Sequence, residues 1–384
     1  MRIVLPVARL VPVLFCFMLL VSLLSPPVHA DGGAPNLAYV AGTTSGINVI
    51  DIAQQRVTGA LDVSGDPQTI LLSVDGRLLY VTQPALKRVT VVATYTKKAL
   101  CTAPYSGHPT LLTLDPGTNT LYVAGTDANV VEAIDPMTCT IRHTLTTGGS
   151  VEGIAVAIVG GSILGGNGNQ LWVAQANGLS IFDAAGNQLA NIAMGDGPRY
   201  LCIPPGPVAY VTTRQGSVNA VDLHSRRVFP QLLSGGSFGP MDFDETNGEV
   251  YVPDRQHNRV DVLTPVNPAT SATPHEPLRV IAMPGSPQSI AITSDGQFGF
   301  VAVQDGTVVM LDIPGRQAVN TFHVGGQPHF IITGLYPSLL SLTPQQATLL
   351  SIVENLSHYA AAGVVVIATV VVIVLNRRRT RRPR

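Results

Sequence analysis

Short hydrophobic segments with alternating polarity recur along residues 37–333, and turn residues bound each one. An aromatic residue followed by valine appears seven times, at intervals of 38 to 50 residues. The aromatic positions are Tyr39, Tyr80, Tyr122, Trp172, Tyr210, Tyr251 and Phe300. Alternation over four to eight residues predicts half-buried strands. Their regular spacing predicts a repeat architecture.

Each repeat contains four such segments. The segment after the aromatic one ends in aspartate in five repeats, at Asp51, Asp135, Asp183, Asp222 and Asp312, while Ala93 and Thr264 take that place in the other two. A third segment ends in glycine. The fourth opens with proline in six repeats, at Pro67, Pro109, Pro198, Pro240, Pro287 and Pro328, and with Val151 in the remaining one. Four short strands per repeat are typical of a β-propeller blade.

The order of the segments also predicts how the ring closes. The repeats begin with the second strand of a blade at Leu37 and finish with a lone inner strand at residues 328–333. We expect the last strand to pair with the first, which leaves no long free sheet edge. Residues 37–333 show no helical periodicity. The prediction is therefore an all-β, seven-bladed propeller of four-stranded blades over residues 31–334.

These repeats resemble the YVTN-type β-propeller repeat family, whose units read LYV, then a VxVID strand, then a proline-led inner strand that ends in a DG turn. The resemblance covers residues 37–333 and implies seven blades and a place at the cell surface or in the periplasm. It implies no particular chemistry. The chain departs from the pattern in a Gly-rich insertion at 159–169, a Pro/Thr-rich insertion at 264–277 and the missing proline at Val151, departures that affect loop geometry only.

The N-terminal segment predicts export. Residues 1–30 contain Arg2 and Arg9, an apolar run over residues 10–24, and small residues at Val28 and Ala30 before Asp31. This order is that of a cleaved secretory signal peptide. An uncleaved anchor helix is the less favoured alternative, because Pro26 and Pro27 disfavour a continuous helix.

The C-terminal segment predicts a single membrane span. Residues 359–375 carry no charge, and residues 376–384 form an arginine-rich tail. Arginines flanking a span remain cytoplasmic, so the propeller is expected outside the cell. Residues 335–358 form a stalk, and Thr343, Pro344 and Gln346 mark the start of one juxtamembrane and transmembrane helix that continues to residue 375. The expected location is the cell membrane, with one pass and a cytoplasmic C-terminus.

Charge and composition narrow the class of protein further. Charged residues make up 12% of the chain and hydrophobic residues 46%, which excludes a charge-rich disordered chain. Without the eight terminal arginines, 15 cations face 24 acids, so the exported part has a net charge of about −9. This balance argues against nucleic-acid binding. Three lysines against 20 arginines suggest a GC-rich, bacterial gene.

Inner strands surround the channel of a propeller, and the residue after each proline begins that lining. We predict a ligand site at the channel mouth, where Arg199 next to Glu152 suits a small polar ligand. The residues of this site are Gln68, His108, Thr110, Glu152, Arg199, Gln288 and His329. The plainer interpretation is that a channel mouth is polar because it is wet.

Other motifs carry less weight. Gly235, Ser237 and Gly239 match G-x-S-x-G, but the motif precedes an inner strand and lacks the strand–turn–helix of a nucleophile elbow. The histidines are scattered without zinc-binding spacing. An acidic loop containing Asp242, Asp244, Glu245 and Glu249 lacks EF-hand spacing and is interpreted as a solvated turn. We therefore predict no catalytic residue, no metal and no cofactor.

Three cysteines remain after the signal peptide. An odd number leaves at least one thiol outside an internal disulfide. Cys202, in an inner strand, is expected to be buried. Cys101 and Cys139 fall near the outer strands of consecutive blades, and whether they pair is left open.

The sequence favours a membrane-anchored propeller that binds a small polar ligand or an extracellular protein. A lactonase-like or other small-molecule enzyme with its site at the channel mouth is the alternative. A structural component of the cell envelope is a third reading.

Overall fold

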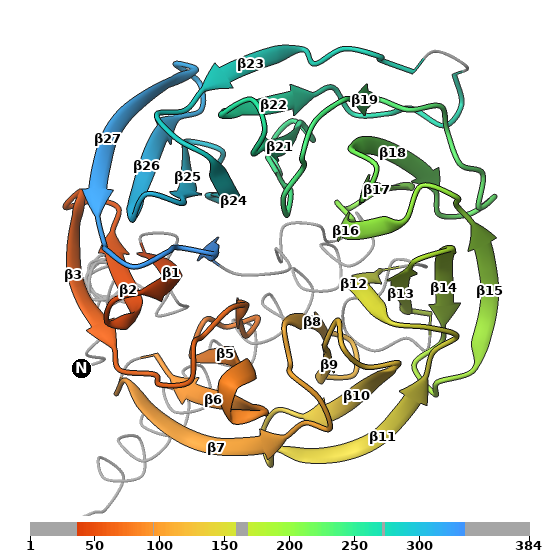
Figure 1. The fold of residues 1–384 in the computed structure, drawn as a ribbon, viewed down its shortest axis with the longest axis horizontal. Helices are drawn as coiled ribbons and strands as arrows, with labels where there is room; N and C mark the ends of the chain where they lie inside the picture. Colours follow the sequence, from red (N-terminus) through yellow and green to blue (C-terminus); the bar gives the residue numbers. More distant parts are fainter. Residues whose placement is uncertain (1–36, 95, 159–167, 271–272, 335–384) are drawn as a thin grey trace, which may run out of the picture.

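The computed structural model describes residues 37–94, 96–158, 168–270 and 273–334. These residues form seven four-stranded antiparallel sheets around a central axis, as Figure 1 shows. The predicted all-β, seven-bladed propeller with four-stranded blades is confirmed. Two predicted segments, the signal peptide at 1–30 and the helix at 344–375, lie outside the described residues. Within the described ranges no helix is long and apolar enough to cross a membrane.

The first four blades, with strands named from the channel outward, are as follows. Blade 1 contains β28 (Phe330–Thr333), β1 (Leu37–Thr43), β2 (Gly46–Asp51) and β3 (Arg56–Leu61). Blade 2 contains β4 (Ile70–Leu72), β5 (Leu78–Gln83), β6 (Arg88–Ala93) and β7 (Lys98–Pro104), with a 3₁₀ turn at Pro84–Leu86. Blade 3 contains β8 (Leu111–Asp115), β9 (Thr120–Ala124), β10 (Val130–Asp135) and β11 (Thr140–Thr146). Blade 4 contains β12 (Val151–Ala157), β13 (Gln170–Gln175), β14 (Gly178–Phe182) and β15 (Gln188–Ala193).

The remaining three blades follow the same order. Blade 5 contains β16 (Pro198–Cys202), β17 (Val208–Thr213), β18 (Ser217–Asp222) and β19 (Leu233–Ser234). Blade 6 contains β20 (Asp242–Phe243), β21 (Val250–Asp254), β22 (Arg259–Leu263) and β23 (Arg279–Ala282). Blade 7 contains β24 (Pro287–Ile292), β25 (Phe298–Val303), β26 (Thr307–Asp312) and β27 (Gln317–His323).

Blade 1 closes the ring in the way the sequence predicts. β28 pairs antiparallel with β1, from Ala38 opposite Thr333 to Ala41 opposite Phe330. In Figure 1 the blue end of the described chain enters the blade formed by its red start. Strand pairing within blade 1 therefore joins the two ends of the propeller.

The repeated aromatic residues hold neighbouring blades together. Each lies on the second strand of its blade and is at most 4% exposed. Tyr39 of β1, for example, shares a hydrophobic cluster with Ile70 and Leu72 of the next blade. Burial of such a large side chain contributes about 1.5 to 3 kcal/mol. The aromatic repeat in the sequence is thus the repeated packing contact between blades.

The repeated aspartates have a local role. Asp222 Oδ1 accepts hydrogen bonds from the amides of His224 (2.9 Å) and Ser225 (2.6 Å). Asp135 Oδ1 likewise accepts from the amide of Met137 at 2.9 Å. These bonds stabilise the turn that leads to the outer strand. The aspartates therefore belong to the scaffold rather than to the channel.

The structure pairs two of the cysteines. A disulfide joins Cys101 of β7 to Cys139 in the turn before β11, so it links the outer edges of blades 2 and 3. Cys202 of β16 is buried, as expected, and burial raises the pKa of its thiol. The pairing that the sequence left open is thus a link between adjacent blades.

Candidate functional site

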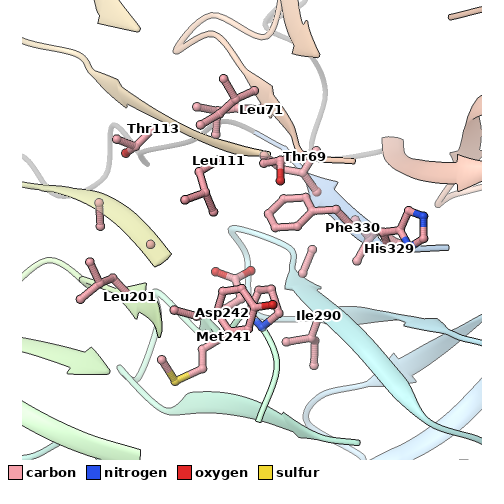
Figure 2. Close-up of a pocket in the computed structure, with 18 of the residues that line it drawn as sticks. Thr69, Leu71, Leu111, Thr113, Leu201, Met241, Asp242, Ile290, His329 and Phe330 are labelled. Atoms are coloured by element: carbon pink, nitrogen blue, oxygen red, sulfur yellow. The ribbon is translucent and has the colours of Figure 1, made fainter. Parts of the chain in front are cut away.

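A cavity of about 400 Å³ lies on the propeller axis, and all seven inner strands contribute to its lining. Figure 2 shows side chains that reach it from different blades, among them Leu71, Leu201, Ile290 and Phe330. Pockets of this size, largely apolar with a few polar groups, are the usual sites for small ligands.

A β-bulge near the start of several inner strands explains why polar side chains gather at the mouth. The register between inner and second strand shifts at Glu152 in blade 4, after Pro198 in blade 5 and at Gln288 in blade 7. A bulge leaves one residue outside the ladder and redirects its side chain. The residue at the bulge therefore faces the cavity, and later residues of the same strands, such as Leu201 and Ile290, line it as well.

The structure brings six of the seven predicted site residues together in the cavity lining. They are Gln68, Thr110, Glu152, Arg199, Gln288 and His329. The seventh, His108, is outside the lining: its Nδ1 lies 2.5 Å from Asp127 Oδ2 on an exposed part of blade 3. Six of the predicted residues thus line one cavity, and ligand binding by them stays a prediction.

Arg199 and Glu152, which the sequence predicts to lie next to each other at the mouth, have different side-chain partners. Glu152 pairs with Arg214 of the neighbouring blade, not with Arg199. The Arg199 guanidinium instead lies over the Tyr200 ring, 4.7 Å from its centroid. The two inner strands lie close here, because a Cβ at Gly153 would lie 1.8 Å from the Arg199 carbonyl oxygen. β12 and β16 therefore approach each other closely through their main chains.

Several mouth residues are occupied by contacts between blades. Thr69 Oγ1 donates to the Thr110 carbonyl at 2.6 Å, and His329 Nε2 lies 3.9 Å from Asp66 Oδ1. An Arg255 guanidinium nitrogen donates to the Gln288 carbonyl at 3.0 Å. These bonds connect blades 2 and 3, 1 and 2, and 6 and 7. Part of the polarity at the mouth is therefore structural.

Asp242 is a cavity residue that sequence reasoning placed wrongly. It was expected in a solvated turn, but it lies on β20 and lines the cavity (Figure 2). Its Oδ2 accepts a hydrogen bond from the Ile292 amide at 2.7 Å. Burial, together with the nearby carboxylates of Glu245 and Asp244, raises the pKa of Asp242 to about 7.

Blade 6 has a short inner segment, which accounts for the error. Asp242 pairs in the ladder with the aromatic Tyr251. In the other blades the partner of that aromatic residue is Leu71, Thr113, Ala155, Cys202, Ala291 or Ile332. Only 11 residues separate Pro240 from Tyr251, against 13 between proline and aromatic residue in blades 2, 3 and 7. Counting this interval would have placed Asp242 at an inward position.

The rest of the acidic loop is ordered by its own hydrogen bonds. Asp244 is 2% exposed and accepts bonds from the amide and hydroxyl of Thr246 at 2.8 and 2.6 Å. It thus caps the turn between β20 and β21. Among the described residues no group of three potential ligands has a geometry that would hold a metal ion. The G-x-S-x-G segment lies between β19 and β20, in the loop predicted for it.

Comparisons with known proteins support the fold and leave the activity open. No family model matches the chain. A curated relative, the uncharacterized protein YncE of Salmonella typhimurium (strain LT2), is 25% identical over 207 residues, which cover 51% of this chain and 54% of the relative. The chain thus spans about half the length of the curated relative it matches.

Solved structures resemble the propeller as a whole. Kuenenia stuttgartiensis hydrazine synthase has a TM-score of 0.63 at 18% identity, covering 73% of this chain and 93% of that one. A chain of a mitotic checkpoint complex has a TM-score of 0.61 at 14% identity, covering 72% and 86%. Dihydro-heme d1 dehydrogenase NirN in complex with DHE has a TM-score of 0.58 at 13% identity, covering 78% and 75%. At these identities the likeness shows a β-propeller scaffold and nothing finer about its chemistry.

Proposed function

We propose that the chain is an exported, membrane-anchored propeller of the YVTN type that works as a binding module, with a small polar ligand in its central cavity. The main support for a binding site is the cavity of about 400 Å³, to which every inner strand contributes lining residues. Polar and apolar side chains contribute about equally to its wall, a composition that suits a small polar ligand.

Binding is preferred over catalysis for a chemical reason. In the described part of the chain, the cavity lining holds neither a cysteine nor a serine next to a histidine that would activate it. The lactonase-like alternative therefore has no specific observation in its favour. A binding module needs only the shape and the polar groups that the cavity already has.

A fragment screen tests the binding proposal. The full chain, purified in detergent, is screened by ligand-observed NMR against small polar compounds. A cavity-filling variant, Leu111→Trp, should lose the hits, because Leu111 lines the cavity. The matched control Leu100→Trp should keep them, because Leu100 is 60% exposed on the outer strand β7. Hits that survive Leu111→Trp, or no hits at all, would reject the central cavity as a binding site.

The proposed membrane topology has its own test. The charge-free residues 359–375 and the arginine-rich tail support a single span with the propeller outside. In intact cells, external protease should remove an epitope placed in the exposed turn after β10, near Met137, and should spare one placed after residue 384. Protection of the Met137 epitope, with lysed cells as the control for cleavage, would reject this orientation.

A further inference from the structure

The cavity carries opposite charges at two depths. At the mouth, the guanidinium groups of Arg199 and Arg255 lie 4.7 and 5.8 Å from the centroid of the Tyr200 ring. Glu152, a carboxylate of the same lining, is paired with Arg214. Arg255 donates to a backbone carbonyl, while its Nε is buried without a partner. Two guanidinium groups, those of Arg199 and Arg255, therefore lie together in the cavity lining.

A carboxylate lies deeper in the same cavity. Asp242 accepts one hydrogen bond, from the Ile292 amide, and within the described ranges it forms no ion pair with a cation. The titratable groups around it are Asp244 and Glu245 of its own blade and Cys202 of the adjacent β16. Across the cavity the charged or titratable lining residues are Arg199, Arg255, Glu152 and His329. A desolvated carboxylate in such surroundings gains most from a bound cation.

The two charged regions are separated along the strands. Asp242 lies opposite the aromatic Tyr251 in the ladder of blade 6. In blade 5, Pro198 lies opposite Thr213, three residues beyond the aromatic Tyr210. Arg199 follows Pro198, so it lies about two strand residues from the level of the aromatic residue. Two strand residues correspond to roughly 7 Å at about 3.3 Å per residue. The wall between is apolar, formed by Leu111, Leu201, Met241, Ile290 and Phe330 (Figure 2).

We infer that the cavity binds a small zwitterion, whose anionic group contacts Arg199 and Arg255 and whose protonated amine contacts Asp242. This inference rests on the proposed function and specifies its ligand class. A carboxylate on a guanidinium and an ammonium on a carboxylate are both charge-assisted contacts. The apolar wall accommodates a short hydrocarbon spacer. A ligand with only one charge leaves the opposite protein charge without a partner.

Proton linkage gives the inference a distinctive signature. The pKa of Asp242 is raised to about 7, so its carboxyl is increasingly protonated below that pH. An ammonium ligand requires the carboxylate form, while its own amine stays protonated throughout this range. Binding should therefore weaken about tenfold from pH 8 to pH 6. The pKa of an arginine is far above this window and contributes no such dependence.

Calorimetric titration of the full chain in detergent tests the inference with three probes. ε-Aminocaproate carries both charges, caproate only the carboxylate and n-hexylamine only the amine. The zwitterion should bind at least tenfold more tightly than either single-charge probe. Asp242→Asn should remove its advantage over caproate together with the pH dependence, and Arg199→Ala should remove its advantage over n-hexylamine. Arg77→Ala, an exposed substitution outside the lining, serves as the control and should change nothing.

The outcomes separate this inference from the proposal on which it rests. Equal affinity for ε-aminocaproate and either single-charge probe overturns the zwitterion and leaves small-ligand binding intact. Absence of binding by all three probes overturns the inference as well, and the fragment screen then decides the broader proposal independently. Because the probes are compared on the unmodified chain, a variant that fails to fold does not obscure the result.

Discussion

The inner and outer strands belong to the same repeated unit but differ in how much of each strand is buried. Every residue of the inner strand β12 is buried, whereas the outer strands β7, β11 and β27 each have a single buried side chain. Exposed large hydrophobic residues lie mainly on outer strands, at Leu100, Ile141, Leu189, Val280 and Val319. The inner strands combine packing with most of the cavity lining, so we expect substitutions there to have larger and more pH-dependent effects.

Removal of one inner strand should have the largest effect. A chain that ends at residue 326 lacks β28, which pairs with β1 and buries Ile331 and Ile332. The loss of several apolar side chains, at about 1.5 to 3 kcal/mol each, approaches the whole stability of about 5 to 15 kcal/mol of a typical domain. Thermal melts of chains ending at 326 and 340 measure it. Equal midpoints would show that β28 does not close the ring.

The disulfide tests how much a link between outer strands contributes. Cys101 and Cys139 are 38 residues apart in the sequence. Replacement of both by serine should lower the free energy of unfolding by about 2 to 4 kcal/mol, chiefly because the unfolded chain regains conformational freedom. Urea unfolding with and without reductant is the measurement. Reductant should destabilise the original chain and leave the double variant unchanged, and a similar response of both would refute a stabilising disulfide.

Asp242, which lines the cavity, should make the free energy of unfolding depend on pH. Its pKa rises from 3.8 to about 7 on folding, so the folded state holds more protons between these values and loses stability as pH increases through them. Between pH 5 and pH 8 the loss should be about 3 kcal/mol. Asp242→Asn should remove this slope in urea unfolding and stabilise the chain at pH 8. An unchanged slope in the variant would assign the dependence to other groups.

The Glu152–Arg214 ion pair joins a buried side chain to an exposed one, so it tests whether burial sets the cost of a substitution. We expect its effects on stability to be the smallest of those considered. The Glu152 side chain is 6% exposed and that of Arg214 is 55% exposed. Arg214→Ala leaves a buried carboxylate without its partner and should cost about 1 to 3 kcal/mol. Glu152→Gln leaves an exposed arginine and should cost no more than about 1 kcal/mol. Urea unfolding of both variants checks the asymmetry, and equal losses would mean that burial does not decide the cost.

Local patterns in the sequence determined the architecture. The aromatic–valine repeat, the proline-led segments and the turn residues predict strands and hairpins from neighbouring residues alone, and seven copies predict seven blades. The order of segments also predicts closure by residues 328–333, which β28 confirms. Six of the seven predicted mouth residues reach the cavity because they occupy equivalent places in a repeated unit.

Only the tertiary structure decided which groups meet across blades. The partner of Glu152 and the link between Cys101 and Cys139 depend on how neighbouring blades lie against each other, and the inward position of Asp242 depends on the shortened segment of blade 6. A shift of one or two residues in register redirects a side chain without disturbing the hydrophobic pattern. Strand patterns are set by short-range alternation, whereas charge partners are set by distances between blades that no single segment encodes.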